Sequence, residues 1–161
     1  MKIPVTINDE KLIIDENPDE KLLYVLRKRG FISPKRGCER GKCGFCTVLL
    51  DDNPVSSCMI PVGIVKDCQI VTLEHFSKTK EYQDIKSGFE KAGLNVCGYC
   101  SSFKYLKVYK LLKENYRPSK EQLLELTFED KCSCTEQGAF INGILYATAN
   151  RHESEGRKKN V

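Results

Sequence analysis

Apolar positions in the first 74 residues follow the two-residue period of β-strands, with one helical stretch among them. Residues 3–7 alternate between apolar and polar side chains, and residues 12–14 form a second apolar run after a polar turn. These two segments are therefore predicted to pair as a hairpin. A helix is predicted to start at the cap residue Asn17, which precedes a proline, and to end at Gly30.

Three more apolar segments follow, at residues 47–50, 55–58 and 70–73. Turn residues separate them, most clearly Asp51-Asp52-Asn53-Pro54 between the first two. They predict three further strands that complete a sheet with the hairpin. Residues 1–74 are therefore predicted to form one small α+β domain.

From residue 75 to 161 the spacing of apolar side chains is helical, and no segment is typical of a strand. Helices are predicted to end at Ala92-Gly93, to run from about Ser101 to Leu112, to begin at Ser119, and to cover residues 139–149. Short connections between four helices predict a compact bundle. The polar stretch 151–161 is expected to be frayed.

Composition limits the class of protein. The net charge is +4 with basic residues scattered along the chain, which argues against a nucleic-acid-binding surface. No apolar run reaches the roughly 18 residues of a membrane span, and the amino end shows no apolar core of a signal peptide. We therefore expect a cytoplasmic protein with reduced cysteines, whose thiols bind metal rather than forming disulfides.

Eight of the nine cysteines fall into two groups of four. The first quartet has the spacing C-x4-C-x2-C, with a fourth cysteine eleven residues further on, and consists of Cys38, Cys43, Cys46 and Cys58. This spacing is that of plant-type [2Fe–2S] ferredoxins. Three glycines in the loop let backbone N–H groups approach the sulfurs. A zinc knot usually has two C-x2-C pairs, so the first quartet is interpreted as a [2Fe–2S] site.

The second quartet is less specific in its spacing. It has C-x2-C, then 31 residues, then C-x-C, and consists of Cys97, Cys100, Cys132 and Cys134. Each pair precedes a predicted helix, starting near Ser101 or Thr135, and helix amino ends stabilise thiolates and anionic clusters. From the residues alone, an iron–sulfur cluster and a zinc ion both remain open.

The other reactive residues predict little chemistry. The ninth cysteine, Cys68, lies beside a predicted strand and is interpreted as a small packing residue. His75 and His152 have no ligand-like spacing. No catalytic triad, dinucleotide-binding glycine loop or carboxylate pair is recognisable, so substrate chemistry is expected to take place on another chain.

With these motifs, residues 2–150 resemble the small iron–sulfur subunit of the molybdenum hydroxylases, the family of xanthine dehydrogenase and aldehyde oxidoreductase. The segments Gly37-Cys38-x-x-Gly41-x-Cys43-Gly44-x-Cys46-Thr47-Val48, Cys97-Gly98-Tyr99-Cys100 and Cys132-x-Cys134-Thr135 carry the resemblance. It implies a ferredoxin-like β-grasp domain followed by a four-helix bundle, each holding one [2Fe–2S] cluster. It also implies a large molybdopterin-binding subunit and an FAD-binding subunit as partners.

The chain departs from the family pattern around the second quartet. The usual Gln before the first cysteine is Val96, and Cys100 is carried over as the ligand on the pterin side. Further replacements are Ser101-Ser102-Phe103 for Thr-Pro-Gly, Asp130-Lys131 for Asn-Leu, Ser133 for Arg and Glu136-Gln137 for Gly-Tyr. Val96 lacks the hydrogen-bonding side chain that the family Gln offers the pterin.

The resulting hypothesis is an electron-transfer subunit of an oxidoreductase complex, with no turnover of its own. Electrons would pass from a molybdopterin centre to the second-quartet cluster, then to the first-quartet cluster, then to FAD. One alternative is a two-cluster carrier with a different partner, which co-purification distinguishes. Another is a zinc-stabilised interaction module, which would be colourless.

Overall fold

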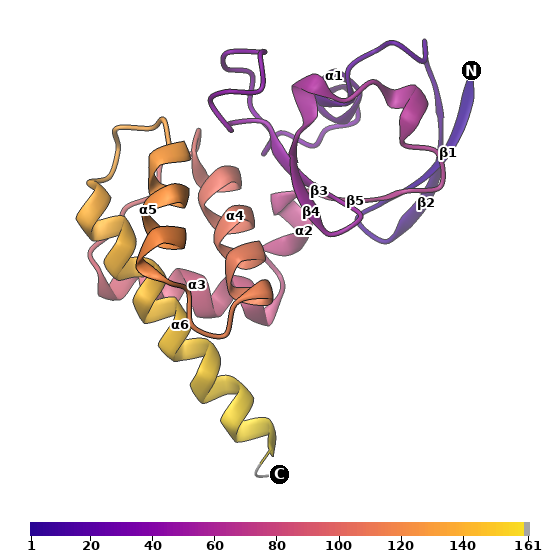
Figure 1. Cartoon of the computed structure of the whole chain (residues 1–161). Helices are drawn as coiled ribbons and strands as arrows, with labels where there is room; N and C mark the ends of the chain where they lie inside the picture. Colours follow the sequence, from indigo (N-terminus) through magenta and orange to yellow (C-terminus); the bar gives the residue numbers. More distant parts are fainter. Residues whose placement is uncertain (160–161) are drawn as a thin grey trace.

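The computed structural model describes residues 1–159, with the strands in the amino-terminal part and the long helices in the carboxy-terminal part (Figure 1). The strands are β1 (Lys2–Ile7), β2 (Glu10–Asp15), β3 (Thr47–Leu50), β4 (Asn53–Ser56) and β5 (Gln69–Val71). The helices are α1 (Leu22–Lys28), α2 (Leu73–Phe76), α3 (Lys80–Lys91), α4 (Ser101–Glu114), α5 (Lys120–Glu129) and α6 (Gln137–Lys159). Two short 3₁₀ turns cover Ser57–Met59 and Val62–Ile64. The predicted α+β class is confirmed.

The strands form one mixed sheet in the order β2-β1-β5-β3-β4. The hairpin β1–β2 is antiparallel, as predicted, and β1 pairs with β5 in parallel. The apolar side of α1 packs on the sheet, where Leu22 and Leu26 join Ile3 and Ile70 in a fully buried cluster. This sheet with one helix across it is the architecture expected of the β-grasp domain.

Helix α1 begins at Leu22, so the predicted start at Asn17 is wrong. The Asn17 side chain instead accepts a hydrogen bond from the Asp19 N–H at 3.1 Å and forms a local turn. The next segment pairs with a distant loop, because the Glu20 carbonyl accepts from the Val62 N–H at 2.8 Å. This tertiary pairing holds the chain extended where the local pattern favours a helix.

The predicted strand 55–58 is placed two residues too late, since β4 covers Asn53–Ser56 and Cys58 lies on the following 3₁₀ turn. The Ser57 hydroxyl donates to the Cys46 carbonyl at 2.6 Å and ties this turn to the first cysteine loop. The predicted strand 70–73 is also displaced, since the central strand β5 covers Gln69–Val71 and residue 73 already begins α2.

The carboxy-terminal helices follow the prediction, including the complete capping box of Ser119 and Gln122 at the start of α5. Within residues 75–159 the structure contains no strand. Helix α6 packs closely along α3, and a Cβ on Gly88 would lie 2.4 Å from the Ala147 backbone nitrogen. The small residue therefore permits the close helix crossing.

The expected fraying is wrong for residues 151–159, which continue α6. Asn150 donates to the Asp84 carbonyl of α3 at 3.1 Å, and Ser154 donates to the Asp84 carboxylate at 3.1 Å. Arg151 and Glu155 form an i,i+4 ion pair. Contacts with α3 thus extend the helix, and the remaining expectation, for residues 160–161, lies outside the described residues.

The two parts of the chain meet where α4 packs on β3 and β4. Tyr109 of α4 donates to the Asp52 carboxylate at 2.8 Å, and Lys113 forms an ion pair with the same group. Near the other end of α4, the buried Ser102 hydroxyl donates to the Ser33 carbonyl at 3.1 Å. These contacts fix the helical part on the edge of the sheet.

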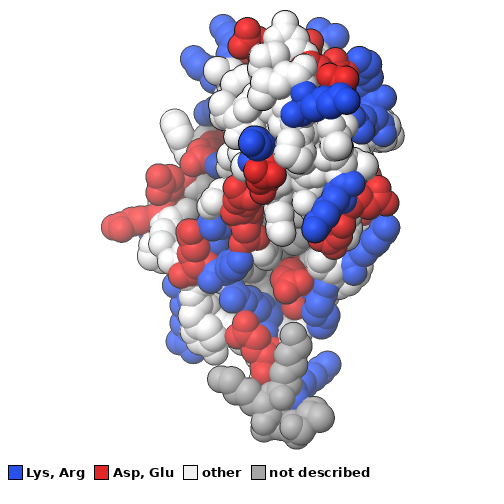
Figure 2. All heavy atoms as spheres, turned by 90° about the vertical axis from the view of Figure 1, so that its right-hand side faces the viewer, with Lys and Arg blue, Asp and Glu red and all other residues white. Residues whose placement is uncertain are grey.

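Acidic and basic side chains are interspersed on the face that Figure 2 shows, without a basic stripe. No helix within residues 1–159 is both long and apolar enough to cross a bilayer.

Candidate iron–sulfur sites

The first quartet begins in the loop between α1 and β3, which wraps around the Cys38 sulfur. Three backbone N–H groups donate to Cys38 Sγ, from Arg40 at 3.3 Å and from Lys42 and Cys43 at 3.2 Å each. The Cys38 N–H in turn donates to Cys43 Sγ at 3.4 Å. Hydrogen bonds from the loop, that of Arg40 foremost, lower the pKa of the Cys38 thiol to about 6.

The loop reaches this shape through backbone conformations with positive φ at Glu39, Gly41 and Gly44. At Gly44 a glycine is required for two reasons. Its φ is +75°, and a Cβ there would lie 2.4 Å from the ring of Phe103 on α4. The first cysteine loop is therefore pressed directly against the start of the helical part.

Cys46 and Cys58 form the buried half of the first quartet. They are 2% and 1% exposed and cluster with Leu23 of α1. Burial, together with the neighbouring Cys46, raises the pKa of the Cys58 thiol to about 11. The structure thus places Cys38 beside Cys43, and Cys46 beside Cys58.

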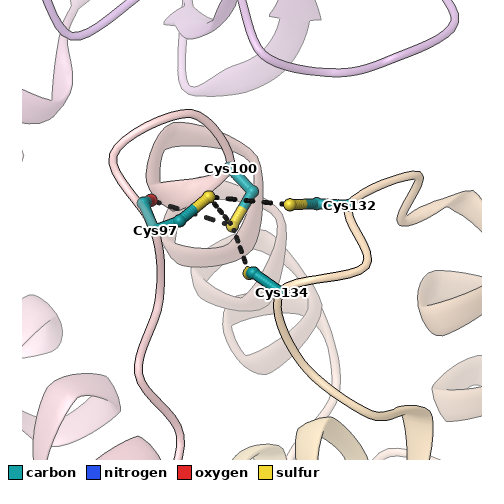
Figure 3. A group of neighbouring side chains, drawn as sticks. All are labelled: Cys97, Cys100, Cys132 and Cys134. Atoms are coloured by element: carbon teal, nitrogen blue, oxygen red, sulfur yellow. Dashed lines mark hydrogen bonds between the residues drawn. The ribbon is translucent and has the colours of Figure 1, made fainter.

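The second quartet is a compact group in which all four sulfurs lie within 4.8 Å of one another (Figure 3). Cys97 and Cys100 come from the turn before α4, and Cys132 and Cys134 from the loop between α5 and α6. The sulfurs of Cys97 and Cys100 are 3.4 Å apart, and those of Cys100 and Cys134 3.3 Å apart. Two chain segments far apart in sequence therefore meet at one point.

Helix amino ends contribute unequally to this site. Cys100 is the N-cap of α4, as predicted, and is fully buried. The second pair lies further from its helix than predicted, because α6 begins at Gln137 rather than near Thr135. Cys132 is held instead by the Asp130 carboxylate, which accepts from its N–H at 3.1 Å.

The second quartet also contains thiols with lowered and with raised pKa values. Burial opposes ionisation of Cys97, but hydrogen bonds led by the Cys100 N–H lower the pKa of its thiol to about 7. Burial raises the pKa of the Cys100 thiol well above its ordinary value. Burial likewise raises the pKa of Cys132.

Lys104 lies beside this quartet, although the sequence prediction does not include it. Its side chain is fully buried, with Nζ 3.3 Å from Cys100 Sγ and 2.8 Å from an Asp130 oxygen. The signal was available, because a lysine stands four residues after Cys100, one turn along the predicted helix, next to the apolar position Phe103.

The two cysteine loops also touch each other. The ring of Phe45, which lies between Cys43 and Cys46 in the sequence, is 6.0 Å from the ring of Tyr99 between their centroids. Tyr99 stands between Cys97 and Cys100 in the sequence and remains 60% exposed. The contact places the segment from Cys43 to Cys46 against the segment from Cys97 to Cys100.

The ninth cysteine, the two histidines and Val96 have ordinary surroundings. Cys68 packs beside the sheet core, as expected of a small packing residue, and burial raises the pKa of its thiol. His75 faces Asp9 at 3.0 Å, and His152 stacks on the ring of Tyr116. Val96 is partly buried against the helical core.

The donor set fits iron–sulfur chemistry. Each quartet offers sulfur donors only, as [2Fe–2S] clusters require. Within the described residues, the second quartet is the one whose four sulfurs the structure gathers within 4.8 Å. At the first quartet, backbone N–H groups donate to Cys38 in the manner that tunes such clusters. The sulfurs of the second quartet would also suit one tetrahedral zinc ion, so geometry alone leaves that alternative open.

Comparison with protein families distinguishes between an iron–sulfur cluster and a zinc ion. Residues 5–67 match the family described as "2Fe-2S iron-sulfur cluster binding domain", and residues 72–145 match the "[2Fe-2S] binding domain" family. The chain thus contains two [2Fe–2S]-binding domains in succession, the first ferredoxin-like. Both matches support iron–sulfur clusters and neither supports zinc.

Three similar proteins cover nearly the whole chain. The nicotinate dehydrogenase small FeS subunit of Eubacterium barkeri is 33% identical over 90% of this chain and 93% of its own length. The xanthine dehydrogenase iron-sulfur-binding subunit of Escherichia coli O157:H7 is 28% identical, over 89% and 91%. The crystal structure of quinoline 2-oxidoreductase from Pseudomonas putida 86 superposes with a TM-score of 0.82 at 30% identity, over 94% of this chain and 96% of that chain.

Proposed function

Because this chain belongs to the small iron–sulfur subunits of the molybdenum hydroxylases, we propose that it relays electrons from a molybdopterin centre to FAD through two [2Fe–2S] clusters. It is an electron-transfer subunit of an oxidoreductase. The molybdopterin belongs in this proposal to a large partner subunit and the FAD to another. The chain has no turnover by itself.

Eight cysteines are the proposed ligands, four for each cluster. The amino-terminal cluster is assigned to Cys38, Cys43, Cys46 and Cys58, and the other to Cys97, Cys100, Cys132 and Cys134. The proposed division into domains is 1–74 and 75–161. Glu74 lies at this boundary, and its carboxylate accepts from the Ser33 N–H at 2.8 Å, so the connection itself is anchored to the first domain.

The observation that carries this proposal is the direct packing of the two cysteine loops. Phe45 meets Tyr99, and Gly44 meets Phe103 at the start of α4. Electron transfer slows steeply with distance, so a relay needs its two centres on adjoining surfaces. The protein supplies this placement, and the clusters supply one-electron chemistry when bound.

The surrounding groups of the chain perform two further tasks. The N–H groups of Arg40, Lys42 and Cys43 hold the Cys38 sulfur as a thiolate, the form that binds iron. The burial of Cys46, Cys58 and Cys100 keeps water away from the inner side of both sites. Hydrogen bonding and burial are also the means by which a protein sets cluster potentials.

Anaerobic purification of the complex tests the proposal. We expect about four irons and about four inorganic sulfides per copy of this chain, and two paramagnetic signals after reduction with dithionite. A large molybdenum-containing subunit and a flavin subunit should co-purify and be identified by mass. Zinc in place of iron would overturn the whole proposal, whereas a monomeric chain with about four irons would support the free two-cluster carrier instead.

A further inference from the structure

One lysine side chain is completely buried beside the second quartet. Lys104, on the inner face of α4, is 0% exposed, and its Nζ lies 3.3 Å from Cys100 Sγ and 3.9 Å from Cys134 Sγ. Nζ also lies over the ring of Phe140 on α6, 5.2 Å from its centroid. Lysine is almost never fully buried unless its charge is paired.

Its partner is Asp130, whose carboxylate is only 8% exposed and lies 2.8 Å from Nζ. The other oxygen of Asp130 accepts the N–H of Cys132 at 3.1 Å. The carboxylate therefore fixes the ammonium group and the second cysteine segment at the same time. The nearby carboxylate supplies the opposite charge that a buried ammonium group requires.

A purely structural reason for this pair is weak. Breaking a buried ion pair is costly, yet replacing both partners with apolar side chains often leaves a protein equally stable or stabilises it. The direction in which side chains lean along a helix gives a more specific reason for a lysine at this position. Lys104 stands one turn after Cys100, and side chains lean toward the amino end of their helix, which brings Nζ back onto the ligand sulfurs.

The two sites differ in the donors that reach their sulfurs. Cys38 accepts from backbone N–H groups, which carry no net charge. At Cys100 the donor from outside the quartet is a full positive charge in a dry environment, where charge interactions are strongest. A charge-assisted hydrogen bond is also about twice as strong as a neutral one.

We propose that Lys104 acts as a fixed positive charge that raises the reduction potential of the cluster bound by the second quartet. Reduction adds one electron, and hence one negative charge, to that cluster, and a cation at 3.3 Å from a ligand sulfur stabilises the reduced form. The inference rests on the proposed function. It makes this cluster the readier acceptor for an electron that leaves a molybdenum centre.

The test is a potentiometric titration of the purified complex, followed by the paramagnetic signal of each cluster. In Lys104→Met, we expect the reduced-to-oxidised ratio of one cluster to fall at least tenfold at a fixed ambient potential. For a one-electron couple this corresponds to about 59 mV. The signal of the other cluster should keep its midpoint.

Two further variants separate charge from structure. Asp130→Asn retains an acceptor for the Cys132 N–H but removes a negative charge, so the same midpoint should move upward. Lys107→Met is the matched control, because Lys107 lies on α4 like Lys104 and also pairs with a carboxylate of α5, that of Glu129 at 3.0 Å, but is partly exposed. Its two midpoints should equal those of the wild type.

Equal midpoints in wild type and Lys104→Met, at full iron content, would overturn the inference. Downward shifts in both the Lys104 and Asp130 variants would also overturn it, since general damage to the site moves both alike. If Lys104→Met loses the cluster, the inference is tested by Asp130→Asn instead. An unchanged reduction midpoint in that variant would overturn the inference. A wild-type complex without about four irons or without two signals contradicts the proposed function itself, before any variant is compared.

Discussion

The two cysteine quartets reach similar chemistry by different structural routes. The first is built largely from one continuous loop, in which the backbone folds around the Cys38 sulfur and donates its own N–H groups. The second joins two segments separated by 31 residues, and a buried lysine from the apolar face of α4 contacts it. Local chain geometry shapes the first site, whereas packing of the helices shapes the second.

Despite this difference, the pKa values of the thiols are shifted in a similar way in the two quartets. Each quartet contains one cysteine whose pKa is lowered, to about 6 at Cys38 and about 7 at Cys97. Each also contains a buried cysteine whose pKa is raised, Cys58 and Cys100. One thiolate per site is thus available to metal near neutral pH, while the buried thiol loses its proton only as metal binds.

Removal of one ligand from each site is the strongest way to separate them. In Cys58→Ser and in Cys100→Ser, we expect the loss of about half of the iron and of one paramagnetic signal, a different one in each variant. Metal analysis and spectroscopy of the purified complex check this. Cys68→Ser is the control and should keep all of its iron. Loss of every iron from either ligand variant would contradict the independence of the two sites.

Alanine at one glycine in each loop should reveal how much each site depends on local geometry. Gly44→Ala places a Cβ at φ +75° and against Phe103, whereas Gly98 has open space within 4 Å. Backbone strain and overpacking together should cost about 3 kcal/mol at Gly44. The thermal midpoint should therefore fall by about 9 °C for Gly44→Ala and by less than about 2 °C for Gly98→Ala. Equal falls would show that both loops are equally constrained.

The pH dependence of thiol alkylation sharpens the comparison within the first site. The thiolate is the reactive form, and the pKa of Cys38 is about 6, so its alkylation by iodoacetamide in metal-free protein should reach half of its plateau near pH 6. Cys58, with a pKa of about 11, should react at least tenfold more slowly at pH 8. Peptide mass mapping after timed quenching gives both rates. A midpoint near pH 8.5 for Cys38 would contradict the role of its N–H donors.

The smallest effect concerns the helix that leads to the second cysteine pair. Ser119→Ala removes the capping box of α5 and should cost about 1 kcal/mol, or about 3 °C in the thermal midpoint. Ser119→Asp keeps the cap and should match the wild type. Cluster midpoints should be unchanged in both, since Asp130 and Lys104 are untouched. A shift in midpoint would mean that α5 positions the second site more directly than its contacts indicate.

Much of the fold follows from short-range patterns. The hairpin, the helix ends at Gly30 and Gly93 and the capping box at Ser119 all depend on residues a few positions apart. The helix expected at Asn17 failed because its backbone pairs with a loop around Val62. The continuation of α6 beyond residue 150 likewise depends on Asp84 of α3, which no local pattern reveals.

The sequence by itself determined the eight candidate ligands, their division into two groups and the change from strands to helices, because ligand spacing and side-chain periodicity are properties of the chain. Only the tertiary structure decided that Gly44 and Phe45 press against the start of α4 and that Lys104 and Asp130 meet beside Cys100. The physical reason is that burial and charge pairing depend on which distant surfaces pack together. A lysine on a helix is ordinarily solvated, and only the helices around this one enclose its charge with the sulfurs.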